Sequence, residues 1–207
     1  MKLLLFGGTF DPPHKGHISL LKNAIAAVQP DKVLVIPAAD PPHKAAAQTS
    51  GQLRFAMCEC FLSVDARVAL DDMEIKRGGK SYTYDTVCAL RKKWPDAQIF
   101  MIMGSDMLLY FKKWYRYEDL LHMVTLVCQN RAPQDVPQVY RFRKQLEEEG
   151  ADILLCENAI LEISSTEIRS LYAQGQNIGA LVPADVEQII NKNRLYKAQS
   201  IKESTEI

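Results

Sequence analysis

The chain has 207 residues, with 25 basic and 25 acidic side chains and a formal net charge of zero at pH 7. This balance argues against a nucleic-acid partner, because such proteins usually carry a basic excess or a basic stripe. No apolar run approaches the ~20 residues that span a bilayer, and no signal peptide opens the chain, which argues against a membrane partner. The five cysteines lie mostly in apolar segments, as is typical of buried free thiols in a reducing cytoplasm.

Short apolar runs alternate with helical patterns along the whole chain. Most of the runs are continuous stretches of Val, Ile, Leu and Met, as in parallel strands that are buried on both faces. They predict strands over Lys2–Phe6, Lys32–Pro37, Val68–Leu70, Gln98–Met103, Val124–Cys128 and Ile153–Cys156. Apolar residues three and four apart predict helices between them, among others over Ile18–Val28, over Val87–Trp94 and after Pro183.

The repetition of strand, helix and strand predicts an α/β fold, a doubly wound parallel sheet with right-handed crossovers. We expect one domain over residues 1–196, followed by a polar C-terminal tail over residues 197–207. Ligands of open parallel sheets bind beyond the carboxyl ends of the strands. Polar segments follow four of the predicted strands, and we expect a binding site there, formed by Gly7–His17, Asp40–Lys44, Gly104–Asp106 and Asn130–Arg131.

The first of these segments carries the strongest chemical pattern. Gly7 and Gly8 form a predicted turn that lets backbone amides approach a ligand, and the following helix N-terminus favours phosphate. His14 and His17 stand three residues apart at that helix start, where imidazoles suit the charge of a phosphoryl group under attack. Two histidines at this spacing are also compatible with a structural role, and a zinc site lacks further ligands. The pattern favours an enzyme that moves a nucleotide's phosphate.

A second segment, Ser164–Arg169, combines a helix start with a cation. Ser164 and Glu167 have the spacing of a capping box, which by itself predicts only a capped helix. Arg169 follows within two turns, and its planar guanidinium can hold phosphate oxygens as a fork. Glu167 complicates this interpretation, because a carboxylate that caps the amides competes with an anion for them.

The motifs His14-Lys15-Gly16-His17 and Ser164–Arg169 resemble the His-x-Gly-His and Ser-Ser-Thr-x-x-Arg motifs of the Rossmann-like nucleotidyltransferase superfamily. Over about residues 1–196, the chain is similar to the bacterial nicotinate-nucleotide adenylyltransferase family. The further segments that carry this resemblance are Gly7–Pro12, Pro41–Lys44, Ser81–Thr83, Gly104–Asp106 with Trp114, and Leu181–Pro183.

The resemblance implies a reaction of ATP with nicotinate mononucleotide that gives nicotinate adenine dinucleotide and pyrophosphate, a step of NAD biosynthesis. It implies catalysis by positioning and charge stabilisation, with Mg²⁺ brought in with ATP and no metal site made by the protein alone. The implied catalytic residues are His14, His17 and Arg169. The implied ATP-binding residues are Gly7, Gly8, Thr9, Phe10, Gly104, Asp106, Ser164 and Ser165. The implied nicotinate-nucleotide-binding residues are His43, Lys44, Ser81, Tyr82, Thr83 and Trp114.

Three alternatives stay open at the level of the sequence. The acceptor of the adenylyl group can instead be nicotinamide mononucleotide, or another phosphate-bearing compound such as phosphopantetheine or a sugar phosphate. The same fold also serves non-catalytic nucleotide sensors, although the presence of both histidines and Arg169 argues against this class. The oligomeric state is left open.

Overall fold

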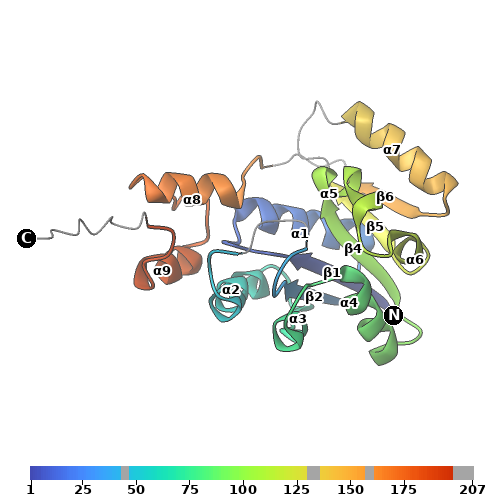
Figure 1. The fold of residues 1–207 in the computed structure, drawn as a ribbon, viewed down its shortest axis with the longest axis horizontal. Coiled ribbons are helices and arrows are strands. Elements are labelled where there is room, and N and C mark those ends of the chain that lie inside the picture. The colour runs from blue at the N-terminus through green and yellow to red at the C-terminus, as the bar shows by residue number, and fades with distance from the viewer. Residues whose placement is uncertain (43–46, 130–135, 157–160, 198–207) are drawn as a thin grey trace, which may run out of the picture.

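The computed structural model describes residues 1–42, 47–129, 136–156 and 161–197. Its centre is a six-stranded parallel sheet in the order β3-β2-β1-β4-β5-β6, which is a doubly wound arrangement (Figure 1). The strands are β1 Lys2–Gly8, β2 Lys32–Pro37, β3 Val68–Leu70, β4 Gln98–Gly104, β5 Thr125–Gln129 and β6 Asp152–Cys156. The strand order reverses direction between β1 and β4, where open sheets of this kind place their ligands.

The helices cover both faces of the sheet. One face, which includes Leu4 and Phe6, packs against α1, α8, α9 and the 3₁₀ helix η1, while the other, which includes Leu3 and Leu5, packs against α4 to α7. Buried Leu3 to Phe6 form a continuous apolar run because each successive side chain enters the opposite core. The helices are α1 Lys15–Val28, α2 Gly51–Met57, η1 Cys58–Ser63, α3 Met73–Arg77, α4 Thr83–Lys93, α5 Ser105–Leu109, η2 Phe111–Lys113, α6 Tyr117–Leu121, α7 Val136–Glu148, α8 Ser165–Ala173 and α9 Ala184–Lys192.

The predicted fold class is confirmed, and the strand boundaries differ from the prediction in an informative way. Gly7 and Gly8 do not form a turn after β1 but are its last residues, paired with Ile36 and Pro37 of β2. Gly104 similarly ends β4, opposite Gln129. Pairing in a parallel sheet uses only backbone groups, so glycine can extend a strand while leaving its surface bare of side chains. The sharp change of direction comes after Gly8, where Phe10 has a φ of 49°.

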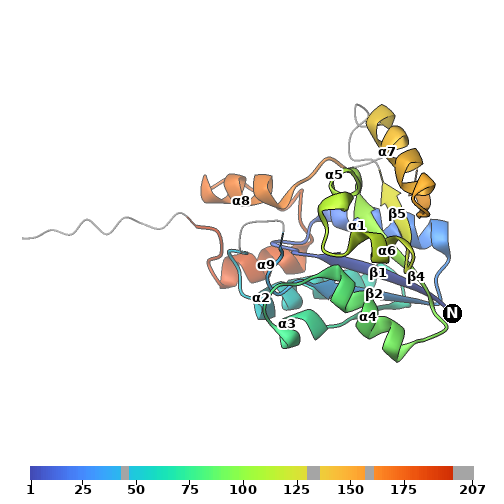
Figure 2. The same cartoon turned by 45° about the vertical axis from the view of Figure 1, so that its right-hand side comes forward.

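The C-terminal helices lie at one end of the molecule. Figures 1 and 2 both show α8 and α9 at the end of the molecule opposite the N-terminus. Strand β1 runs from the N-terminus toward this end. The segment after β1 and the start of α8 therefore meet in space, although they are far apart in the sequence. None of the described helices is long and apolar enough to cross a membrane.

Candidate active site

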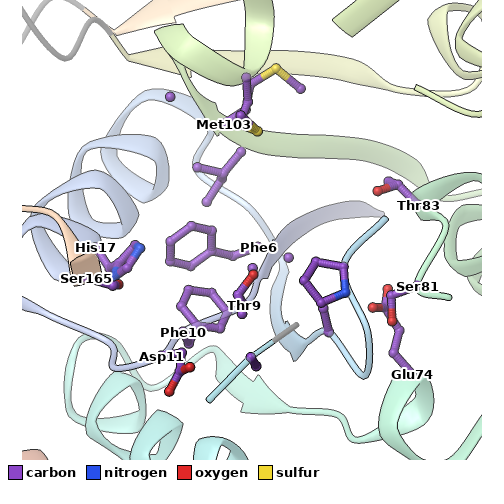
Figure 3. Close-up of a pocket in the computed structure, with 18 of the residues that line it drawn as sticks. Phe6, Thr9, Phe10, Asp11, His17, Glu74, Ser81, Thr83, Met103 and Ser165 are labelled. Atoms are coloured by element: carbon purple, nitrogen blue, oxygen red, sulfur yellow. The ribbon is translucent and has the colours of Figure 1, made fainter. Parts of the chain in front are cut away.

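A cavity of about 540 Å³ opens at the carboxyl ends of β1 and β4. Figure 3 shows His17 and Ser165 on one side of it, and Ser81, Thr83 and Glu74 on the other. We call the first side, formed by His14, His17, Ser165 and Arg169, the histidine end. We call the second side, formed by Ser81, Tyr82, Thr83, Trp114 and Tyr115, the aromatic end.

The two histidines cap α1 for each other. His14 is the N-cap residue, and its Nδ1 accepts a hydrogen bond from the backbone N–H of His17 at 3.3 Å. The Nδ1 of His17 accepts in return from the backbone N–H of His14, also at 3.3 Å. A ring nitrogen that accepts a hydrogen bond carries no proton, so a neutral imidazole held in this way has its proton on Nε2. Both rings are thereby set as Nε2 donors.

The two imidazoles are stacked, with ring centroids 3.6 Å apart and an angle of 25° between the planes. Gly16 makes this stack possible, because a Cβ at this position would lie 3.0 Å from Nδ1 of His14 and 3.1 Å from the carbonyl oxygen of Leu161. Contacts this short force a neighbour to move, and here the neighbours are a capping ring and a backbone oxygen. Packing therefore favours glycine at this position of the His-x-Gly-His motif.

Aromatic side chains form the wall beneath the histidines. The ring of Phe10 meets that of His17 edge-on, with centroids 5.2 Å apart, and Phe6 lies beside both (Figure 3). Gly8 accommodates Phe10, since a Cβ there would lie 2.8 Å from Cζ of the ring. This apolar wall excludes water from one side of the imidazoles, which strengthens their electrostatic interactions with a bound anion.

The N-terminus of α8 completes the histidine end. Ser164 caps the helix, with its hydroxyl accepting from the backbone N–H of Glu167 at 3.1 Å, as the sequence predicts. The Ser165 hydroxyl donates to the carbonyl of Pro12 at 2.8 Å, and Arg169 Nη1 donates to the carbonyl of Asp11 at 2.8 Å. The side chain of Glu167 is exposed and, among the described residues, does not line the cavity, so it does not block an anion there.

The aromatic end is built around the start of α4 and the segment after η2. The rings of Tyr82 and Tyr115 lie 4.7 Å apart, and Trp114 packs against Phe111 with centroids 5.2 Å apart. Tyr115 is 49% exposed, so this end opens toward solvent. Ser81 anchors it to the rest of the site, because its hydroxyl accepts from the backbone N–H of Ala39 at 2.8 Å.

Glu74 lines the cavity at the aromatic end and was not anticipated from the sequence. It is only 7% exposed, and its carboxylate accepts a hydrogen bond from the Thr86 hydroxyl at 2.5 Å. Burial raises the pKa of Glu74, while the hydroxyls of Thr86 and Ser81 and the charge of Arg77 oppose the rise. The carboxylate holds Ser81 and the first turns of α4 in place from below the cavity.

Arg54 is a second residue that sequence reasoning missed. The residue is 1% exposed, and its guanidinium donates to three backbone carbonyls, those of Thr9 at 2.7 Å, Ala39 at 3.0 Å and Thr49 at 3.1 Å. Burial lowers the pKa of Arg54, and the nearby carboxylate of Asp11 opposes this. The side chain ties the segments after β1 and β2 together. A signal was present, since Arg54 stands three residues before Met57 on the apolar face of α2.

The structure brings the predicted site residues together, with one exception. The cavity lining includes each of them that the structure describes except Asp106, whose carboxylate lies near Cys128 and helps burial to raise the pKa of that thiol to about 12. His43 and Lys44 lie outside the described residues, as do Asn130 and Arg131. Among the described residues, no group of three His, Cys, Asp or Glu side chains is placed to hold a metal ion.

Comparisons with known proteins agree with this geometry. Residues 5–171 match the cytidylyltransferase-like family. The chain is 40% identical, over 95% of its length and 93% of the relative's, to a probable nicotinate-nucleotide adenylyltransferase of Gemmatimonas aurantiaca. A protein of the same name from Clostridium tetani is 34% identical over 95% of this chain and 99% of its own. The chain belongs to the nicotinate-nucleotide adenylyltransferase family.

A solved structure extends the family likeness to the fold. The nicotinic acid mononucleotide adenylyltransferase of Plasmodium falciparum, complexed with NaAD, superposes with a TM-score of 0.78. The alignment covers 94% of this chain and 97% of that one at 18% sequence identity. The resemblance inferred from the two motifs, and the single-domain Rossmann-like sheet that it implies, are confirmed.

Proposed function

We propose that the protein transfers the adenylyl group of ATP to nicotinate mononucleotide, giving nicotinate adenine dinucleotide and pyrophosphate in NAD biosynthesis. The observation that carries this proposal is that one cavity joins the histidine end to the aromatic end. Phosphate groups suit the first and a pyridine ring suits the second. The family of the close relatives supports the same reaction.

In this reaction the 5′-phosphate of the mononucleotide attacks the α-phosphorus of ATP in line. A new P–O bond forms to the attacking oxygen, and the bond from the α-phosphorus to the β-phosphate oxygen breaks, so that pyrophosphate leaves. Negative charge shifts onto the leaving pyrophosphate. His14 and His17, with their protons on Nε2, donate hydrogen bonds to phosphate oxygens as this charge develops. No covalent intermediate with the protein is required.

We assign the triphosphate to the histidine end together with the start of α8. Gly7, near the end of β1, leaves room for phosphate next to the backbone, while the space beside Gly8 is filled by the ring of Phe10. Arg169 supplies a charged fork, and Ser164 and Ser165 supply hydroxyls beside it. Arg169 also donates to the Asp11 carbonyl and to the Thr166 hydroxyl. A guanidinium has five N–H donors, so it can hold phosphate oxygens of ATP while it keeps these two contacts.

We assign the nicotinate ring to the aromatic end. The indole of Trp114 offers a face on which a pyridine ring can stack. Helix α4 begins at Thr83, and in the described part of the chain its N-cap Tyr82 supplies no side-chain hydrogen bond to the first turn. The substrate carboxylate can therefore accept from the N–H groups at this helix start, and its charge is favoured there. An amide in its place gains less, which favours the acid.

Mg²⁺ is proposed to arrive with ATP, held by phosphate oxygens and water, as suits its octahedral preference. When bound it neutralises charge on the phosphates. The five cysteines are free thiols, which fits a reducing cytoplasm as the place of the reaction. The proposed partners are the two small substrates, with no nucleic acid and no membrane.

A pyrophosphate-release assay across a panel of acceptors tests the proposal. The panel contains ATP and Mg²⁺ with nicotinate mononucleotide, nicotinamide mononucleotide, phosphopantetheine or a sugar phosphate. We expect nicotinate mononucleotide to give the highest kcat/KM. A higher value for any other acceptor overturns the substrate assignment. Binding of ATP without pyrophosphate release from any acceptor would instead favour the nucleotide sensor.

A further inference from the structure

Side chains from other parts of the fold donate hydrogen bonds to the backbone carbonyls of the segment between β1 and α1. Arg54 of α2 donates to the carbonyl of Thr9 at 2.7 Å. Two residues of α8 hold the carbonyls further along. Arg169 donates to the carbonyl of Asp11 and Ser165 to that of Pro12, both at 2.8 Å. We call the segment Thr9–Pro12 the first loop. Its backbone position sets that of His14, two residues further on.

The carboxylate of Asp11 anchors the same loop in a different direction. It is 4% exposed, and its Oδ2 accepts from the backbone N–H of Gln48 at 2.8 Å. Its Oδ1 accepts from the hydroxyl of Tyr196 at 2.6 Å, across 185 positions of sequence. Tyr196 follows the end of α9 with a φ of 58°, and its ring packs against the core. Burial and the charge of Asp11 raise the pKa of Tyr196, so the phenol keeps its proton and donates it.

These contacts fall into two sets, of which one uses residues that the proposed function also requires. Arg169 holds the first loop through a guanidinium that the proposed function also requires for the triphosphate. Tyr196 and the Gln48 amide hold it through the Asp11 carboxylate, with groups that the proposed function does not use. The second set therefore holds the loop independently of the residues that bind ATP.

We propose that Tyr196 is a positioning residue, whose hydrogen bond to Asp11 keeps the first loop and the attached histidine pair in register independently of Arg169, which the proposed function assigns to ATP. This inference rests on the proposed function for the role of Arg169. We call the Tyr196–Asp11 hydrogen bond the C-terminal latch. Without it, the buried carboxylate of Asp11 loses one of the two donors that the described residues provide. An unsatisfied buried carboxylate is unfavourable, so we expect the side chain to rotate toward another donor and to shift the loop backbone. A displacement of about 1 Å at a reacting centre can cost about 100-fold in rate.

The chain offers a matched control for the latch. The hydroxyl of Tyr172 on α8 donates to Asn191 on α9 at 2.8 Å, a phenol hydrogen bond in the same C-terminal region. It is exposed and does not reach the first loop. Tyr196→Phe and Tyr172→Phe each remove one hydroxyl and leave the ring, so both variants should fold.

Steady-state pyrophosphate release from the full-length protein provides the first test. We expect Tyr196→Phe to lower kcat about tenfold or more while KM for ATP stays within about twofold. Tyr172→Phe should keep both parameters of the wild type. If Tyr196→Phe lowers only the melting temperature and leaves kcat unchanged, the hydrogen bond is structural and the inference is overturned.

A double-mutant comparison localises the effect to the latch itself. Asp11→Asn keeps an acceptor oxygen, and Asp11→Ala removes it, so the Asn variant should retain more of kcat than the Ala variant. Combined with Asp11→Ala, Tyr196→Phe should add little further loss, because the two groups act through one hydrogen bond. Losses that multiply would contradict the latch.

Hydrogen exchange separates a failure of the latch from a failure of the proposed function. Peptides covering residues 9–17 should exchange at least about tenfold faster in Tyr196→Phe than in the wild type or Tyr172→Phe. This measurement needs no turnover. Unchanged exchange overturns the latch even in an active enzyme. Faster exchange in a protein that releases no pyrophosphate with any acceptor supports the latch and overturns the proposed function.

Discussion

At the histidine end of the cavity the backbone of the first loop is held by side-chain hydrogen bonds from distant parts of the chain, whereas at the aromatic end the side chains meet mainly through ring packing. The first loop receives donors from α2, α8 and Tyr196, which are 45 to 185 positions away. The Phe111–Trp114 pair, by contrast, joins residues of one short segment, and Tyr115 next to it is 49% exposed.

This difference assigns separate tasks to the two ends. Groups that stabilise a transition state act best when their positions are fixed in advance, as at the histidine end. A pocket that selects among similar rings needs shape and stacking, and it tolerates adjustment of its outer side chains. Changes at the histidine end should therefore lower kcat, while changes at the aromatic end should raise KM for the acceptor.

The largest effect is expected from His17→Ala. The change removes one Nε2 donor and the acceptor for the His14 N–H, so we expect kcat to fall by about 10²–10³. Pyrophosphate release measures the loss, and far-ultraviolet circular dichroism checks that the fold is retained. His122→Ala is the control, because His122 is exposed and does not line the cavity. A rate close to that of the wild type for His17→Ala would contradict the assignment of transition-state stabilisation to the histidine end.

Arg169→Lys should have the next largest effect. Lysine keeps the charge but loses the planar fork, so kcat/KM for ATP should fall about 10- to 100-fold. KM for the mononucleotide should change little, because the aromatic end is untouched. An equal rise in KM for both substrates would show that the two ends do not act separately.

Trp114→Ala tests the aromatic end directly. We expect KM for nicotinate mononucleotide to rise about five- to tenfold through loss of ring stacking, with kcat and KM for ATP close to the wild type. Steady-state kinetics with each substrate varied in turn gives these values. Trp94→Ala is the matched control, because this tryptophan packs against the core and does not line the cavity. A large fall in kcat for Trp114→Ala would contradict the division of tasks.

Glu74→Gln should give a smaller, pH-dependent effect on stability. Burial raises the pKa of folded Glu74 above that of the unfolded chain, so the folded protein holds this proton more tightly. The resulting stabilisation is fully present below the unfolded pKa and is lost as pH rises through the folded pKa. Urea unfolding from pH 4 to 7 should show the variant gaining stability relative to the wild type. A constant difference between the two would mean that the pKa is not raised.

The smallest effect is expected from deleting residues 198–207. The described contacts of the C-terminus with the first loop end at Tyr196, so a chain that ends after Lys197 should keep kcat and both KM values. A chain that ends after Leu195 should lose kcat as Tyr196→Phe does. Loss of activity in the longer of these two chains would show that residues 198–207 contribute to the reaction.

The sequence predicted the fold and much of the cavity because their signals are local. Continuous apolar runs marked the strands, and the spacing of Ser164 and Glu167 marked the start of α8. Arg54 and Tyr196 were missed for a physical reason. Each holds the first loop through a hydrogen bond to a residue far away in the sequence, Arg54 to Thr9 and Tyr196 to Asp11. The position of Arg54 on the apolar face of α2 signals burial, but no local pattern indicates which groups the fold brings within reach.

Asp106 shows the opposite limit. It follows a buried strand at the expected edge of the sheet, as a site residue should, but helix α5 begins at Ser105 and directs successive side chains around its axis. Met107 lines the cavity, and the Asp106 carboxylate lies toward Cys128. A motif can place a residue at the correct strand end without deciding which way its side chain turns.

Because His14 and His17 cap α1 for each other, the orientation of both imidazoles depends on the first turn of this helix. The nitrogen atoms that close the end of α1 belong to the rings that would meet the phosphates, so fraying of that turn misaligns both donors together. Mild denaturant should therefore inactivate the enzyme before the sheet melts.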